Sequence, residues 1–344
     1  MAGRLLTVAM GMVMAVGALA GCGSTGPATA GSTQTITLYN GQHEETTDAL
    51  VAAFTRLTGI KVKIRSDDED VLAQQIEQEG QASPADVVFT ENSPALEVLQ
   101  DKHLLAALPA STLADVPARF DSPRGDWAGV SARVSVLVYN TRDLPKSKLP
   151  TSVMQLAGPQ WSGKLAIAPG ETDFQPVVTS IAGAYGQQAA LRWLRAIKAN
   201  AGNHVYPDNE TIAADVNSGR AQIGIINHYY WYRLRYEIGA ASMHSAIAAF
   251  AAGDPGYVLD VSGAAVLASS RHRSAAQRFV AFLVSEQGQQ IIAKGDSFEY
   301  PLGSGVHTSQ PLIPFGQLRP DSIGVAALGD GHLALSLLQQ AQLL

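Results

Sequence analysis

Short strand-like runs alternate with segments of helical periodicity along the first part of the chain. The strand-like runs are rich in β-branched and aromatic residues and read "TITLYN" (35–40), "KVKIR" (61–65) and "ADVVFT" (85–90). The segments between them, 44–59 and 69–80, carry apolar residues at the spacing of an amphipathic helix. This βαβαβ order predicts a largely parallel sheet covered by helices.

The acidic run "SDDED" (66–70) lies at the predicted start of the second helix. Ser66 is a typical N-cap residue, and acidic side chains are favourable at a helix N-terminus. Gly59 is placed to end the preceding helix as its C-cap. We therefore interpret the acidic run as helix-start electrostatics rather than as a metal-binding loop.

The middle third of the chain repeats the α/β plan, which predicts a second lobe rather than a long insertion. Its strand-like runs are 133–140, 164–168 and 221–227, and its helical segments are 187–200 and 209–219. A further strand, a long helical segment and a helical tail follow at 262–269, 274–295 and 331–343.

The first residues, "MAGRLLTVAMGMVMAVGALAGC", have the features of a targeting segment, with one Arg, an apolar run and small residues at the end. The run is too short and too rich in Gly for a transmembrane helix. Its last four residues, "LAGC", resemble the lipobox of bacterial lipoproteins, which implies a signal peptide at 1–21 and lipidation of Cys22. An ordinary secretory signal with a chance Cys is the alternative. Cys22 is the only cysteine, so an intrachain disulfide is excluded.

A tether rich in Gly, Ser and Thr is predicted at 22–33, and about 320 residues remain after Cys22, enough for two lobes. We expect one lobe from 34–133 plus 260–310 and the other from 134–259 plus 311–344. Hinge strands are expected near 133–140 and 257–263.

The formal net charge is -6, from 24 Lys and Arg against 30 Asp and Glu. Removing residues 1–21 takes away Arg4 and no acid, which gives -7. The chain has no basic stripe, so a nucleic-acid partner is not expected. It also contains no visible nucleophile–base pair and no Walker motif, which favours a binding protein over an enzyme.

Residues able to bind metal follow three of the predicted strands. His43 comes after the first strand, Glu91 after the third, and Tyr229 and Tyr230 after the strand 221–227. Ligands of open parallel sheets sit outside the carboxyl ends of strands, so these positions mark a candidate site. If the last strand continued through the tyrosines, they would point to opposite faces.

Both tyrosines can therefore serve one site only if the strand breaks at about Asn227 and His228. We expect a turn there, or the start of a helix. His228 is interpreted as a loop residue or a support for the site, and Trp231 and Tyr232 as packing residues.

The chain resembles the periplasmic ferric-ion-binding proteins that supply iron to ABC transporters. The resemblance runs from about Thr33 almost to the C-terminus, through "YNGQH", "TGIKV", "PADVVFTE", "WSGK", "NHYYWY", "SGAAVL" and "EYPL". It implies an α/β, two-lobed, type II periplasmic-binding fold, similar to a transferrin lobe, with a hinge between the lobes. It also implies that His43, Glu91, Tyr229 and Tyr230 bind Fe³⁺.

The resemblance extends to partners and location. It implies a monomeric receptor, not an enzyme, that works with an ABC permease and its ATPase. The lipobox would place it on the extracytoplasmic face of the cell membrane, held there by a lipid anchor. Its cargo would be Fe³⁺, with a bound anion or water completing the coordination.

The proposed ligands suit ferric iron, because two phenolates and one carboxylate balance its three positive charges while the His stays neutral. A free phenol has a pKa of about 10, so at neutral pH only the field of the metal keeps both tyrosines ionised. Iron would then displace protons, and affinity would fall as the pH drops.

The rest of the coordination stays open at the sequence level. In the family an anion such as phosphate often completes it, and the residues expected nearby are Asn92, Asn209, Asn227 and the loop "PGETDFQP" (169–176), with Glu171, Thr172 and Asp173. The two acids of this loop would repel phosphate. Either water replaces the anion, or one of the acids is an extra ligand. Arg133 would offset this charge or form a structural ion pair.

Two other functions are considered. The same receptor fold would carry an organic or oxyanion solute, although such a cargo does not need two adjacent phenols with a His and a Glu. A non-haem ferric enzyme with Tyr and His ligands needs a second, closely spaced His, which is missing near these motifs.

Overall fold

The computed structural model describes residues 34–303 and 305–344. The predicted signal peptide, the lipidation site Cys22 and the tether lie outside the described residues. In the part of the chain that is described, no helix is both long and apolar enough to cross a membrane.

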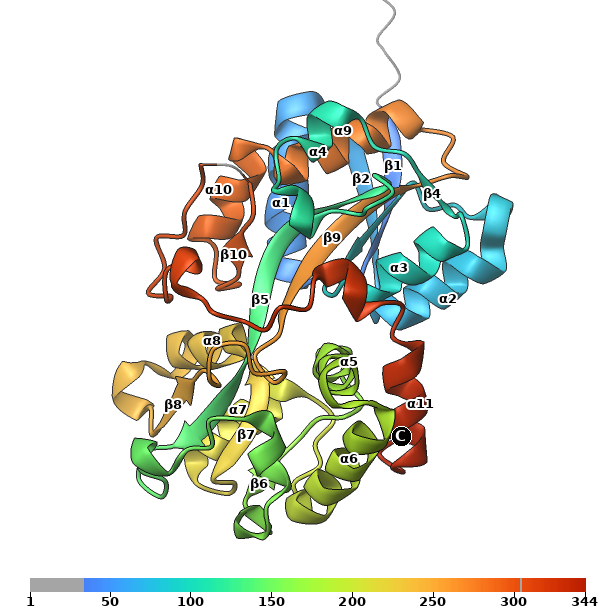
Figure 1. Cartoon of the computed structure of the whole chain (residues 1–344). Helices are drawn as coiled ribbons and strands as arrows, with labels where there is room; N and C mark the ends of the chain where they lie inside the picture. Colours follow the sequence, from blue (N-terminus) through green and yellow to red (C-terminus); the bar gives the residue numbers. More distant parts are fainter. Residues whose placement is uncertain (1–33, 304) are drawn as a thin grey trace, which may run out of the picture. The chain divides into compact units, whose positions relative to one another are not determined.

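The described chain is a mixed α/β structure (Figure 1). Its strands are β1 (Thr35–Asn40), β2 (Lys61–Ser66), β3 (Val87–Thr90), β4 (Leu105–Ala106), β5 (Trp127–Asn140), β6 (Leu165–Ala166), β7 (Ile223–Asn227), β8 (Ser245–Ala248), β9 (Leu259–Leu267) and β10 (Tyr300–Pro301). Its α-helices are α1 (Glu44–Thr58), α2 (Glu69–Glu79), α3 (Pro94–Asp101), α4 (Ala110–Leu113), α5 (Phe174–Tyr185), α6 (Gln187–Ala201), α7 (Asn209–Ser218), α8 (His228–Ile238), α9 (Arg273–Val284), α10 (Glu286–Lys294) and α11 (His332–Gln340).

The sheet is mixed, so the prediction of a largely parallel sheet is wrong outside β1–β3 and β6–β7. β1 pairs in parallel with β2 and β3, and β6 pairs in parallel with β7. β9 comes from late in the sequence and lies between β3 and β5, antiparallel to both. Strand order along the sequence does not reveal this, because no βαβ crossover connects β9 to either neighbour.

β5 carries the chain from one half of the sheet to the other. Its first part pairs with β9 as far as Val134, and from Ser135 onward it pairs with β7 and β8. We call the half built on β1–β4, β9, β10 and the start of β5 the first lobe, and the half built on β6–β8 and the rest of β5 the second lobe. The lobe boundary predicted after residue 133 lies next to the point where β5 changes its pairing from β9 to β7. The other predicted lobe boundaries stay predictions.

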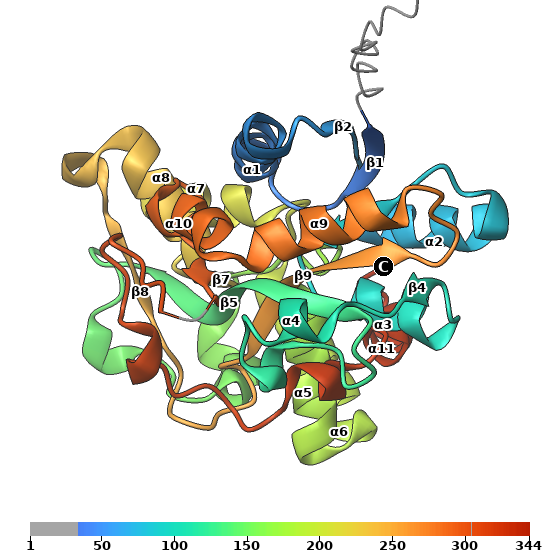
Figure 2. The same ribbon diagram turned by 90° about the horizontal axis from the view of Figure 1, so that it is seen from above.

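Helices cover both lobes. In the first lobe α9 packs along β9 and β5 and contacts α1, as Figure 2 shows. In the second lobe the C-terminal helix α11 packs against α5 and α6. All fourteen residues of β5 are buried, so the strand that joins the lobes runs through the core.

The break predicted before the tyrosine pair is confirmed. β7 ends at Asn227, whose backbone is still extended, and α8 begins at His228. Tyr229 and Tyr230 therefore lie in the first turn of a helix, where successive side chains diverge by about 100° rather than by the 180° of a strand.

His228 fixes the start of α8 to the strand that joins the lobes. Its Nε2–H donates to the carbonyl oxygen of Phe298 at 2.9 Å, and its Nδ1 accepts from the N–H of Val134 at 3.4 Å. The ring also stacks on Tyr300 with 4.8 Å between centroids. A neutral imidazole with the proton on Nε2 satisfies both bonds, so His228 supports the helix rather than lying in a loop.

We expect the free energy of unfolding to depend on pH through His228. Burial lowers the pKa of His228 from 6.5 to about 3 in the folded protein. The contribution of the neutral ring is therefore complete above pH 6.5 and is lost toward pH 3, by about 1.4 kcal/mol per pH unit. Urea denaturation of the wild type and of His228→Gln measures this, and the advantage of the wild type at pH 7 should shrink on acidification.

The matched control is His307→Gln, which changes an exposed imidazole. Its stability should follow the wild type at every pH. A stability difference between the wild type and His228→Gln that stays constant from pH 7 to pH 4 contradicts the role assigned to the buried ring.

Candidate metal centre

His43 is held in a defined orientation by its neighbour Gln42. The Oε1 atom of Gln42 accepts from the backbone N–H of His43 at 2.8 Å and from its ring Nδ1 at 2.6 Å. The other ring nitrogen, Nε2, lies 3.8 Å from Oε1 of Glu91. Burial, with the charges of Arg233 and Arg133, lowers the pKa of His43 to about 3. The ring is therefore neutral near pH 7, and its Nε2 lone pair faces Glu91.

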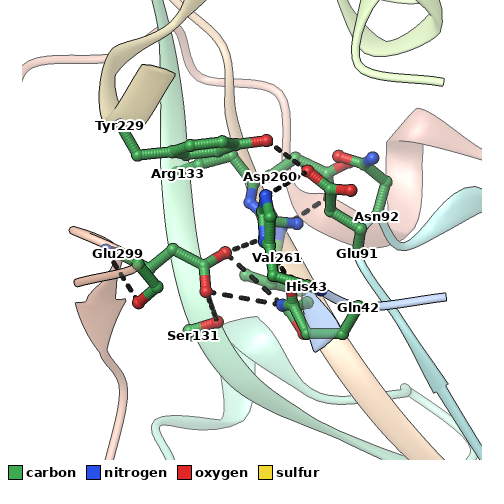
Figure 3. Close-up of polar contacts among 12 residues, drawn as sticks. Gln42, His43, Glu91, Asn92, Ser131, Arg133, Tyr229, Asp260, Val261 and Glu299 are labelled. Carbon is green, nitrogen blue, oxygen red and sulfur yellow. Dashed lines mark hydrogen bonds and ion pairs between the residues drawn. The ribbon is translucent and has the colours of Figure 1, made fainter. Parts of the chain in front are cut away.

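Glu91 follows β3 and meets a tyrosine from the other lobe. The hydroxyl of Tyr229, in the first turn of α8, donates to Oε1 of Glu91 (Figure 3). The same carboxylate oxygen thus lies beside both Tyr229 and His43. The ends of β1 and β3 and the start of α8 converge at this point, as the strand-end argument predicts.

Tyr229 and Tyr230 lie side by side and are buried. Their ring centroids are 4.2 Å apart, and the ring of Tyr229 is packed edge-on against His43 at 5.1 Å. Burial first, and then the charge of Asp173, raises the pKa of both phenols well above 10. Without a cation beside them, both hydroxyls keep their protons at neutral pH.

Asp173, just before α5, is the acidic loop residue that reaches the tyrosines. Its Oδ2 accepts from the hydroxyl of Tyr229 at 3.2 Å and from Nδ2 of Asn209 at 3.2 Å. Its Oδ1 accepts from Nδ2 of Asn92 in the other lobe at 3.1 Å. Burial and the charge of Glu91 raise the pKa of Asp173 to about 6, while Arg133 acts in the opposite direction.

Three other residues of the predicted site, Thr172, Glu171 and Asn227, differ in the hydrogen bonds that their side chains make. Thr172 Oγ1 accepts from Asn92 at 3.1 Å, so it joins the contact between the lobes. Glu171 is partly exposed, and burial with the charges of Asp173 and Glu91 raises its pKa to about 8. Within 34–303 and 305–344, no side-chain hydrogen bond links Glu171 or Asn227 to the proposed ligands.

Arg133 forms a buried ion pair with Glu299 (Figure 3), which agrees with the structural alternative given for it. Its guanidinium carbon also lies 5.7 Å from the centroid of the Tyr229 ring. Glu299 accepts further bonds from Ser131 Oγ at 3.2 Å and from Gln42 Nε2 at 3.4 Å. The ion pair therefore connects the strand that joins the lobes to the loop that carries His43.

Sequence reasoning missed the residues that hold the proposed ligands in place. These are Gln42, which contacts His43, Glu69, which contacts the backbone of Glu91, and Glu299, which contacts Gln42. Gln42 had a local signal, its position next to His43. Glu299 lies far from its partners in the sequence, and Glu69 was interpreted only as part of an acidic helix start.

The cluster offers hard donors, since phenol and carboxylate oxygens outnumber one imidazole nitrogen. Over the described ranges, no group of three or more His, Cys, Asp or Glu side chains is arranged to hold a metal ion. A cavity of about 140 Å³ borders His43 and is also lined by Glu45, Arg233 and Tyr236.

Two curated relatives and one solved structure that are similar to this chain are named for iron. The chain is 37% identical over 342 residues to the Fe(3+)-binding periplasmic protein of Serratia marcescens. This alignment covers 99% of this chain and 98% of that protein. It is 38% identical over 311 residues to the major ferric iron-binding protein of Neisseria meningitidis, covering 89% of this chain and 92% of that one. The structure of iron-bound HitA from Pseudomonas aeruginosa matches with a TM-score of 0.85 and 42% identity, covering 90% of this chain and 99% of HitA.

The fold agrees with these relatives, which share the two-lobed α/β architecture of periplasmic binding proteins. The family model described as bacterial extracellular solute-binding protein matches residues 82–312. The protein is therefore a solute-binding protein rather than an enzyme, and the chain belongs to the family of bacterial extracellular solute-binding proteins.

Proposed function

We propose that this protein captures ferric iron between its two lobes and delivers it to an ABC permease. The observation that carries the proposal is the convergence of Tyr229, Tyr230, Glu91 and His43 from the two lobes. The relatives from Serratia and Neisseria are named for Fe(3+) or ferric iron binding, and HitA was crystallised with iron.

The donor set accounts for both binding and release. Fe³⁺ replaces the protons of Tyr229 and Tyr230, and the two phenolates with Glu91 then supply three negative charges while His43 stays neutral; a fourth, from Asp173, lies near the guanidinium of Arg133. Because the pKa of each phenol is raised well above 10 without the metal, protons compete with iron for the same oxygens. Affinity therefore falls as the pH drops, and the lobes are expected to open when iron leaves.

Asp173 is proposed as the group that completes the coordination in place of an exogenous anion. Its Oδ2 lies 3.2 Å from the hydroxyl of Tyr229, whereas within residues 34–303 and 305–344 no side-chain hydrogen bond joins Glu171 to a proposed ligand. A carboxylate at this position repels phosphate, and Asn92 and Asn209 donate to the carboxylate instead. The side-chain amides of Asn92 and Asn209, which were expected to contact an exogenous anion, thus contact Asp173.

The remaining parts of the proposal concern the membrane. Lipidation of Cys22 would anchor a monomeric receptor to the extracytoplasmic face of the cell membrane through the tether 22–33. A permease would receive the iron, and its ATPase would supply the energy.

An organic cargo is disfavoured by the donor set, because such a cargo does not need two adjacent phenols together with a His and a Glu. An oxyanion is disfavoured because the carboxylates of Glu91 and Asp173 would repel it.

Titration of purified iron-free protein with ferric citrate tests the ligand set. We expect a visible phenolate-to-iron charge-transfer band that is weakened in Tyr229→Phe and in Tyr230→Phe and lost in the double variant. Tyr232→Phe, on the same helix but stacked on Phe298, is the matched control and should keep the band. A colourless wild-type protein saturated with iron would rule out the tyrosine ligands.

Iron binding with and without added phosphate tests the role of Asp173. We expect the wild type to be indifferent to phosphate. Asp173→Asn should bind iron about ten- to a hundred-fold more weakly, because a charged oxygen beside the metal is lost. Glu171→Gln is the control for charge in the same loop and should bind like the wild type. Strong phosphate dependence of the wild type would contradict the assignment.

A further inference from the structure

Glu69 turns into the protein although the acids before it face solvent. It is the first residue of α2 and is 3% exposed, while Asp67 and Asp68 are exposed. An acidic side chain in the first turn of a helix usually lies at the surface, where it interacts with the helix dipole. The inward direction of Glu69 therefore calls for a partner inside the protein.

The partner is the loop that carries Glu91. Oε2 of Glu69 accepts from the backbone N–H groups of Glu91 at 2.6 Å and Asn92 at 2.8 Å. Two successive amides thus point at one carboxylate oxygen just after β3 ends. This pair of bonds fixes the backbone of Glu91, and so the direction from which its side chain reaches Tyr229.

The loop that carries His43 packs against the same residue. A Cβ atom placed on Gly41 would lie 2.7 Å from Cβ of Glu69, closer than real side chains approach. Gly41 therefore allows the loop after β1 to rest directly on the start of α2. Glu69 is in contact with both loops of the first lobe that carry proposed ligands.

Asn92 extends these contacts to the second lobe. Its Nδ2 lies 3.1 Å from Oε1 of Glu69 and also 3.1 Å from Oδ1 of Asp173 and Oγ1 of Thr172. All three partners accept hydrogen bonds, so the amide nitrogen has to face them. Glu69 holds this amide on one side, and Asp173 meets it on the other.

Both oxygens of Glu69 face N–H donors, so the group serves as an acceptor on both sides. Burial, with the charges of Glu91 and Asp70, raises the pKa of Glu69 and so disfavours the ionised form that accepts on both oxygens. A buried carboxylate is costly unless its hydrogen bonds are satisfied, and three donors satisfy this one.

We propose that Glu69 is a positioning residue of the iron site, which holds Glu91 through its backbone and presents the Asn92 amide to Asp173 of the other lobe. This inference rests on the proposed function, because Glu91 and Asp173 are proposed ligands. Mutation of a residue that supports a metal ligand in this way typically lowers metal affinity ten- to a hundred-fold.

Two variants of different severity test the proposal. Glu69→Ala removes all three bonds. Glu69→Gln keeps the size of the side chain but replaces one oxygen with an N–H₂ group, which then faces either the loop amides or Asn92 Nδ2, donor against donor. Asp68→Asn is the matched control, because it removes an exposed carboxylate one residue away.

The first measurement is amide hydrogen exchange of the iron-free protein, resolved by residue with NMR. We expect at least ten-fold faster exchange at Glu91 and Asn92 in Glu69→Ala, a smaller increase in Glu69→Gln, and no change in Asp68→Asn. Exchange at Val261 in β9 should stay as in the wild type, which separates a local release of the loop from general destabilisation.

The second measurement is the rate of iron loss to excess EDTA, followed at the charge-transfer band. Glu69→Gln should lose iron about ten- to a hundred-fold faster than the wild type, with the band at its usual wavelength because both tyrosines remain. Unchanged exchange at Glu91 and Asn92, or unchanged iron loss in both variants, would overturn the proposal. A wild type that takes up no iron would instead refute the proposed function, and the exchange data would still decide whether Glu69 holds Glu91.

Discussion

Acidic oxygens from both lobes gather next to the buried guanidinium of Arg133. Burial alone would lower the pKa of Arg133, but Tyr229, Glu91 and Asp173 raise it. Burial, and then the charges of Asp173 and Glu91, raise the pKa of Tyr229, and burial with the charge of Glu91 raises that of Asp173, while Arg133 acts in the opposite direction on both. Charges of one sign are stable at such short range only with protons or a cation among them. The two lobes are thus joined by groups that favour a trivalent cation when they lose their protons.

The features that could be predicted from the sequence are local. The break between β7 and α8 follows from the need to bring two adjacent tyrosines to one side, and the positions of His43 and Glu91 follow from the ends of β1 and β3. Gly59 ends α1 as a left-handed C-cap, as its position after a periodic helix predicts. The identity of the metal ligands stays a prediction, although the structure brings the four side chains together.

The features that could not be predicted depend on contacts between distant parts of the chain. β9 lies between β3 and β5, and nothing in its own pattern of residues reveals that. Glu69 looks like its acidic neighbours until the loop after β3 supplies donors for it. Glu299 becomes part of the site only through Arg133 and Gln42. In each case the deciding contact is with a part of the chain more than twenty residues away, and helical or strand periodicity carries no information about such a contact.

A crystal structure of the iron-loaded protein, with the metal located by its anomalous signal at the iron edge, tests the central claim most directly. The account predicts one ferric ion bound by the phenolate oxygens of Tyr229 and Tyr230, a carboxylate oxygen of Glu91 and Nε2 of His43. An Asp173 oxygen should occupy a further position. Iron bound elsewhere, or bound without either tyrosine, would contradict the account.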